Sequence, residues 1–118
     1  MNIAVCIKQV PDTASQLKIA EDNKTIEDNE IKYEINPFDE YALEEALRLK
    51  DKDNTINITV ISLGPERVKQ SLTKTLAMGA DEAIHLQTDN SINDCMAIAN
   101  IITNEIKKKQ YDLILFGK

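Results

Sequence analysis

The chain has 118 residues, of which 42% are hydrophobic and 29% are charged, as expected for one globular domain that buries its own core. Its net charge of −6 argues against a nucleic-acid backbone or an anionic membrane surface as the main partner, because both are bound through faces rich in Lys and Arg. We therefore expect a single domain over residues 1–118, with neither nucleic acid nor membrane as a partner.

The cysteine pattern and the first residues of the chain indicate the cellular compartment in which the protein is expected. The two cysteines, Cys6 and Cys95, form no CxxC pattern, and the single histidine, His85, does not complete a zinc site with them. The first residues, MNIAVCIKQV, lack the basic region and long apolar core of a signal peptide. No apolar stretch approaches the roughly 18 residues that cross a bilayer. These features predict a soluble, cytoplasmic chain without a metal site.

Four short apolar runs predict β-strands. They cover residues 2–8, 56–63, 82–87 and 111–117. The first run is almost continuous in apolar and β-branched residues, which is typical of a strand that is buried on both faces. Each run is followed by a turn or a glycine.

Three segments with the apolar spacing of helices lie between these strands. The first runs from Pro37 to about residue 49, with Tyr41 in its apolar stripe and Glu44 and Glu45 on its solvent face. The second begins at Pro65, a favourable first helical residue, and ends before Gly79.

The third helical segment covers residues 92 to about 109. Ser91 is its predicted N-cap, and Cys95 is predicted to lie in its apolar side. The basic run of residues 107–109 falls at the end of this helix, where cations suit the negative end of the helix dipole.

Strands that alternate with such helices form right-handed βαβ units, which predicts an α/β fold with a doubly wound, mainly parallel sheet. In these sheets the ligand crevice lies beyond the carboxyl ends of the strands. The polar residues 11–35 interrupt the alternation, and KTIEDNEIKYEI within them is compatible with a small hairpin over EDNE. Long loops in compact domains are usually functional or mobile.

The start of the first helix has two interpretations. Asn36 is a strong N-cap residue, Pro37 fits the first helical position, and Asp39 can bond back as in a capping box. These features alone explain a stable helix end. The same helix end is expected to lie near the strand ends, where unsatisfied N–H groups are also a ready site for a phosphate oxygen.

Familiar nucleotide motifs are missing. The chain has three glycines, Gly64, Gly79 and Gly117, so neither GxGxxG nor GxxxxGK[ST] occurs. Gly64 and Gly117 follow predicted strands, where a residue without Cβ permits a tight turn or the close approach of a ligand.

Residue patterns for catalysis are equally weak. Ser62 and Ser71 have no histidine or acid in a recognisable order, and His85 lies inside a predicted strand. Cys6 is predicted to be a small buried hydrophobic residue rather than a nucleophile. The sequence therefore predicts no catalytic residue.

Longer segments carry a family resemblance. IAVCIKQVPDT, INPFDEYALEEALRLK, VISLGPE, TLAMGADEAIHL and the final DLILFGK occur in this order. In order and spacing they resemble the amino-terminal half of the β subunit of electron-transfer flavoprotein, and the likeness covers essentially the whole chain. The chain stops where relatives continue into a phosphate-binding loop, so about half of the expected subunit is absent.

The resemblance implies a Rossmann-like sheet of the adenine-nucleotide α-hydrolase-like type in a heterodimer with the α subunit. Such a subunit carries electrons from flavin-dependent dehydrogenases, such as acyl-CoA dehydrogenase, and has no acid–base residue of its own. The redox FAD is held mainly by the α subunit. The β subunit buries AMP, or a second FAD in a bifurcating branch where NADH also docks, and both alternatives remain open.

Carried over by position, the cofactor contacts of the family fall on particular residues of this sequence: Cys6, Asn36, Pro37, Phe38, Asp39, Leu63 and Gly117. At Cys6 and Leu63 the resemblance implies backbone and packing contacts with the nucleotide. At the helix start it implies that Asn36 holds the turn while the first N–H groups face the ligand.

Two other protein classes fit the sequence less well. A stand-alone ATP/AMP-binding domain of the universal-stress-protein type shares the fold, but it normally has a glycine-rich phosphate loop late in the chain. An ATP-pyrophosphatase-type enzyme needs an SGGxDS-like loop after the first strand, where this sequence has KQVPDTAS.

Overall fold

The structure is a computed structural model that describes residues 1–27, 30–89 and 92–118. Its elements are β1 (Asn2–Cys6), β2 (Gln9–Pro11), β3 (Tyr33–Ile35), α1 (Pro37–Lys52), β4 (Asn57–Gly64), α2 (Val68–Met78), β5 (Glu82–Gln87), α3 (Cys95–Ile106) and β6 (Leu113–Phe116). The predicted N-cap Ser91 and the centre of the predicted EDNE turn lie outside the described residues.

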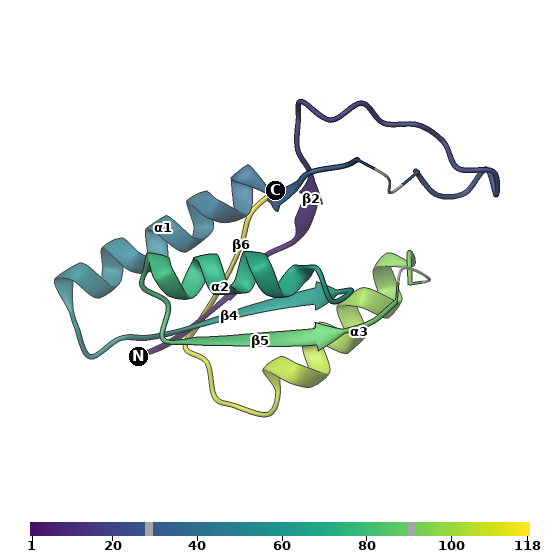
Figure 1. Ribbon diagram of the computed structural model, residues 1–118. Coiled ribbons are helices and arrows are strands. Elements are labelled where there is room, and N and C mark those ends of the chain that lie inside the picture. Colours follow the sequence, from purple (N-terminus) through teal and green to yellow (C-terminus); the bar gives the residue numbers. More distant parts are fainter. Residues whose placement is uncertain (28–29, 90–91) are drawn as a thin grey trace.

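The main sheet has four strands in the order β5-β4-β1-β6, and every neighbouring pair is parallel. Helices α1 and α2 pack on one face of the sheet, and α3 packs on the other (Figure 1). The predicted α/β, doubly wound, mainly parallel fold is therefore confirmed. Because all four strands run in one direction, their carboxyl ends meet at a single edge.

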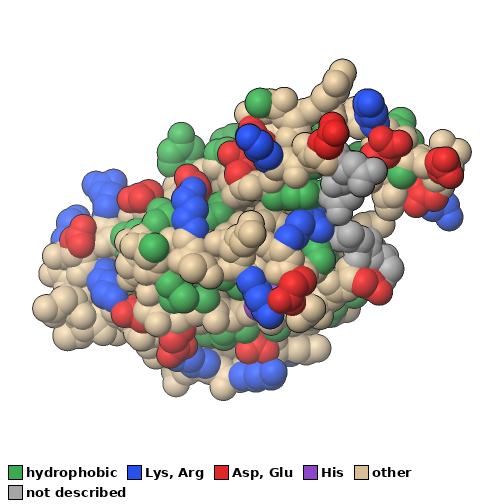
Figure 2. Space-filling view, viewed as in Figure 1, with side chains coloured by type: hydrophobic (Ala, Val, Ile, Leu, Met, Phe, Trp, Pro, Cys, Tyr) green, Lys and Arg blue, Asp and Glu red, His purple; other side chains and the backbone are tan. Residues whose placement is uncertain are grey.

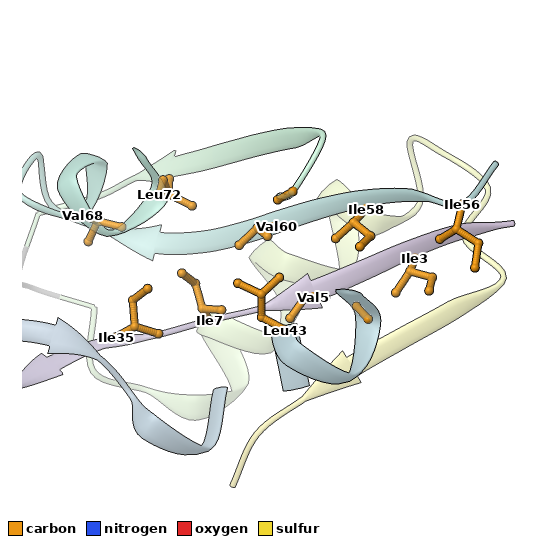
Figure 3. Close-up of a cluster of buried hydrophobic side chains, with 12 residues drawn as sticks. Ile3, Val5, Ile7, Ile35, Leu43, Ile56, Ile58, Val60, Val68 and Leu72 are labelled. Carbon is orange, nitrogen blue, oxygen red and sulfur yellow. The ribbon is translucent and has the colours of Figure 1, made fainter. Parts of the chain in front are cut away.

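The larger core lies between the sheet and α1 and α2 (Figure 3). Ile3 and Val5 of β1 and Ile58 and Val60 of β4 point to this side, and Leu43 of α1 closes it; all five are 0% exposed. Full burial of one such side chain is worth roughly 1.5–3 kcal/mol.

The second core, on the opposite face, contains the alternate residues of the central strands. Ala4, Cys6 and Ile61 are buried there, and Ile102 and Ile106 of α3 pack against them. The central strand β1 is thus buried on both faces, as its continuous apolar run predicted.

The predicted bounds of β5 are confirmed, whereas β1 ends two residues early. The backbone of Lys8 leaves the sheet because its N–H donates to Asp39 Oδ2 (2.8 Å), while its carbonyl accepts from Asn36 N (2.8 Å). The first turn of α1 therefore terminates the central strand.

Helix α2 begins at Val68, so the predicted start at Pro65 was wrong. The N–H groups of Val68 and Lys69 bond to the carbonyls of Pro65 and Glu66, three residues earlier, which makes this segment a tight turn. The predicted end before Gly79 is confirmed: Gly79 has φ +127° and its N–H donates to Leu76 O.

Three predictions about helical side chains had different outcomes. Tyr41 is 71% exposed and Cys95 is exposed, so their predicted places in apolar faces were wrong. Glu44 and Glu45 face solvent, as predicted.

We call residues 12–32 the arm, because they extend away from the sheet in Figure 1. The ladder between the antiparallel strands β2 and β3 closes its base, and an isolated bridge joins Ile19 to Ile26 within it. The hairpin predicted within residues 24–35 was wrong, because residues 33–35 pair with residues 9–11 instead.

Two structural features were not found among the described residues, a membrane-spanning helix and a cluster of metal ligands. No helix in them is long and apolar enough to cross a membrane. Within the same ranges, no group of three or more His, Cys, Asp or Glu side chains is placed to hold a metal ion.

Candidate functional site

The first turn of α1 lies against the carboxyl ends of β1 and β6. Asn36 is the N-cap of α1, and its Oδ1 accepts a hydrogen bond from Phe38 N at 3.2 Å. Its Nδ2 donates to the carbonyl of Lys118 at 3.1 Å, and the end of the chain lies beside the start of α1 in Figure 1. Asn36 thus joins the helix to the segment that follows β6.

The N–H groups of this turn are already bonded. Pro37 has no N–H, Phe38 N is bonded to the Asn36 side chain, and the N–H groups of Asp39 and Glu40 donate to the Asn36 carbonyl at 2.9 and 3.1 Å. The N–H groups that were expected to be unsatisfied are therefore bonded within the protein itself, and a ligand contact at this turn stays a prediction. The turn acts on its surroundings through its side chains.

Asp39 joins two strand ends. Its side chain is buried, at 6% exposure, and its carboxylate accepts from Lys8 N through Oδ2 (2.8 Å) and from Gly117 N through Oδ1 (3.0 Å). Burial raises the pKa of Asp39, and the two backbone hydrogen bonds oppose that shift. The predicted capping box was wrong, because Asn36 N bonds to Lys8 O.

Gly117 packs directly on this turn. A Cβ at Gly117 would lie 2.3 Å from Asp39 Oδ1 and 2.4 Å from both Asp39 N and Phe38 C. The sequence left open whether this glycine serves a turn or a close approach, and the structure shows a close approach by the protein's own helix.

Cys6, the last residue of β1, lies opposite Ile61 of β4 and Phe116 of β6 in the sheet register. Burial raises the pKa of its thiol to about 11, with a smaller contribution from the charge of Asp39. The thiol is therefore neutral at physiological pH, which agrees with the prediction of an unreactive buried residue.

Ser62 and His85 are register partners on β4 and β5, but they form no catalytic pair. The buried Ser62 hydroxyl donates to the Ile7 carbonyl at 2.9 Å, and His85 Nε2 lies 2.9 Å from the Gly64 carbonyl. Both polar groups are occupied by backbone atoms.

A cavity of about 660 Å³ lies at the same carboxyl edge of the sheet, and Lys8, which follows β1, is part of its wall. Its wall includes Leu63 and Gly64 at the end of β4, Thr88 and Asp89 after β5, and Ile98 of α3. Leu63 is the predicted site residue that borders the cavity. Cys6, the residues 36–39 and Gly117 are grouped at the neighbouring strand ends instead.

Sequence reasoning missed the polar wall of this cavity. The buried Gln9 donates through Nε2 to Arg67 O (3.1 Å) and Ser71 Oγ (3.0 Å), and its Oε1 has no hydrogen-bond partner among the described residues. The Arg67 guanidinium lies 4.0 Å from the centroid of the Tyr33 ring. The sequence feature that could have indicated this polar wall was Gln9, a polar residue directly after the apolar run of residues 2–8.

The charges of the cavity wall differ from those of the whole chain. Among the described residues, Lys8, Lys24 and Arg67 line it together with one acidic residue, Asp89, although the chain carries a net charge of −6. Elsewhere on the face shown in Figure 2, side chains of both signs are interspersed. The wall therefore suits an anionic ligand with an apolar portion.

Fold and site define a doubly wound α/β protein with a cavity at the carboxyl edge of its parallel sheet. The family model described as "Electron transfer flavoprotein domain" matches residues 23–118. Three relatives are named electron transfer flavoprotein subunit beta, and each aligns over 100% of this chain. The protein from Clostridium acetobutylicum is 46% identical, that from Megasphaera elsdenii 42% and that from Homo sapiens 31%.

This chain belongs to the electron transfer flavoprotein family, and the relatives it resembles are β subunits. It spans 45%, 46% and 48% of the length of the three relatives, respectively.

Proposed function

We propose that residues 1–118 form a nucleotide-binding domain of an electron-transfer flavoprotein β subunit. The observation that carries the proposal is the cavity with an excess of basic side chains at the carboxyl edge of the sheet. This edge is where open α/β sheets bind ligands, and the chain matches the electron transfer flavoprotein family model over residues 23–118. The same match disfavours a domain of the universal-stress-protein type.

The described residues fit an adenine nucleotide. The cavity volume lies within the roughly 300–1,000 Å³ range of small-ligand sites. Leu63 and Pro65 offer apolar surface to a base, while Lys8 and Arg67 offer positive charge to a phosphate. The buried, unpaired Oε1 of Gln9 marks a wall with unused hydrogen-bonding capacity.

The ligand of this domain is AMP or FAD, and the partner is an electron-transfer flavoprotein α subunit, which holds the redox FAD. A bound flavin supplies the electron chemistry, and this chain supplies binding and orientation. We place the nucleotide among the cavity wall, Cys6, the residues 36–39 and Gly117. The complex passes electrons from flavin-dependent dehydrogenases in the cytoplasm, and NADH is its donor if the β nucleotide is FAD.

The composition of the complex tests the proposal. The gene for this chain is co-expressed with that of the α subunit from the same genome, and released nucleotides are quantified per heterodimer. One FAD with one AMP supports a single-flavin carrier, and two FAD support a bifurcating flavoprotein. A complex that carries no nucleotide in this subunit, or no complex at all, overturns the proposal.

Substitution in the cavity wall tests the site itself. Arg67→Met is expected to lower AMP or FAD affinity, because it removes a positive charge from the wall. The control is Arg48→Met on the outer face of α1, where the side chain is 70% exposed. Equal affinities for the two variants would contradict the placement of the phosphate near Arg67.

A further inference from the structure

The buried carboxylate of Asp39 is fully engaged by the protein itself. One oxygen accepts from Lys8 N at the end of β1, and the other accepts from Gly117 N at the end of β6. The side chain is 6% exposed. A carboxylate in this state has little free surface for a ligand, and its negative charge would repel a phosphate. Direct contact with a nucleotide is therefore a poor role for it.

Its geometry suits a different role. Lys8 and Gly117 follow the adjacent parallel strands β1 and β6, and both are bonded to one side chain of the first turn of α1. The absence of a Cβ at Gly117 lets β6 approach within contact of the Asp39 backbone. One carboxylate therefore fixes the relative positions of two strand ends and a helix start.

We propose that Asp39 is a positioning residue of the nucleotide site: it holds the ends of β1 and β6 against α1, so that the backbone around Cys6, Asn36 and Gly117 keeps the spacing that a nucleotide requires. This inference rests on the proposed function. It concerns the Asp39 carboxylate alone and leaves the nucleotide contact implied at residue 39 to the backbone.

Asp39→Asn is the sharpest substitution, because it preserves the size of the side chain. Its amide has one oxygen to accept from Lys8 N or from Gly117 N, and its NH₂ group then faces the other N–H donor. One strand end must move away from α1. We expect AMP affinity, measured by equilibrium dialysis with this chain, to fall at least about tenfold.

Asp81→Asn is the matched control. Asp81 also accepts from a strand backbone N–H, that of Ile58 (2.8 Å), and also pairs with α1, through Lys50. It lies at the opposite edge of the sheet, because Ile58 is near the start of β4. We expect this variant to be destabilised but to retain AMP affinity within about twofold.

The outcomes of the binding experiment distinguish a failure of the positioning role from a failure of the proposed function. If the wild-type chain binds neither AMP nor FAD, the proposed function fails and the positioning role fails with it. If the wild-type chain binds AMP and folded Asp39→Asn binds it equally well, the positioning role alone is overturned.

A measurement on the wild-type chain covers the case in which Asp39→Asn does not fold. Amide hydrogen exchange is followed by NMR with and without saturating AMP. Positioning predicts that AMP slows exchange at Lys8 and Gly117 more than at Ile58, whose N–H is bonded to Asp81. Equal slowing at all three amides indicates general stabilisation and overturns the proposal.

Discussion

At the scale of single residues, Gly117 has the least room for an added Cβ among the three glycines. An added Cβ would lie 2.3–2.4 Å from atoms of Asp39 and Phe38, and two of these atoms are backbone. We expect Gly117→Ala to lower the free energy of unfolding by about 1–3 kcal/mol, because β6 or α1 must shift. Denaturant unfolding measures this, and an unchanged midpoint would show that the strand end relaxes freely.

The Cys6 thiol predicts a pH dependence of stability. Its pKa is raised from 9.0 to about 11 in the folded chain, so the folded state holds this proton more tightly than the unfolded state does. Its contribution to stability is complete below pH 9 and is lost as the pH rises toward 11. Cys6→Ala is expected to lose less stability than the wild-type chain across this window.

Thermal unfolding at several pH values checks this prediction. Cys95→Ala is the control, because Cys95 is exposed on α3. A Cys6→Ala variant whose stability falls between pH 9 and pH 11 as steeply as that of the wild-type chain would contradict the assignment.

At the scale of elements, the helix caps offer a matched pair. Asn36 Oδ1 bonds to Phe38 N at the start of α1, and Asp94 Oδ2 bonds to Ala97 N at the start of α3. Replacement of either residue by Ala is expected to cost about 0.5–2 kcal/mol of stability.

The two N-cap substitutions should differ in their effect on the affinity for the nucleotide. Asn36 also bonds to Lys118 beside Gly117, whereas Asp94 has no predicted role at the nucleotide. We expect Asn36→Ala, and not Asp94→Ala, to weaken AMP binding in a folded chain, as measured by equilibrium dialysis. Equal AMP affinities of the two folded variants would show that Asn36 has a purely structural role.

The sequence predicted where the strands and helices lie better than it predicted the contacts that their side chains make. Apolar runs located the central strands β1 and β4 because burial on both faces leaves a continuous signal. The start of α2 was missed because Pro65 is also compatible with a tight turn. The roles of Asp39 and Gln9 could not be predicted, because their partners lie 31 to 78 and 58 to 62 residues away in sequence.

At the scale of the whole molecule, the structure divides into a layered body and the arm. The central strands are buried, whereas no described residue of the arm is fully buried. Leu17 and Ile19 of the arm are 56% and 73% exposed, so little apolar burial holds this segment in place. Local opening costs least free energy where buried contacts are few.

Limited trypsin digestion tests this division. We expect the first cuts after Lys18 or Lys24, because both lie in the arm and its backbone opens without disturbing the sheet. Lys50 and Lys74 are the internal comparison, since they lie in helices and pair with Asp81 and Glu40. Mass spectrometry of the first fragments identifies the sites, and initial cuts in α1 or α2 would show that the helical layer opens before the arm.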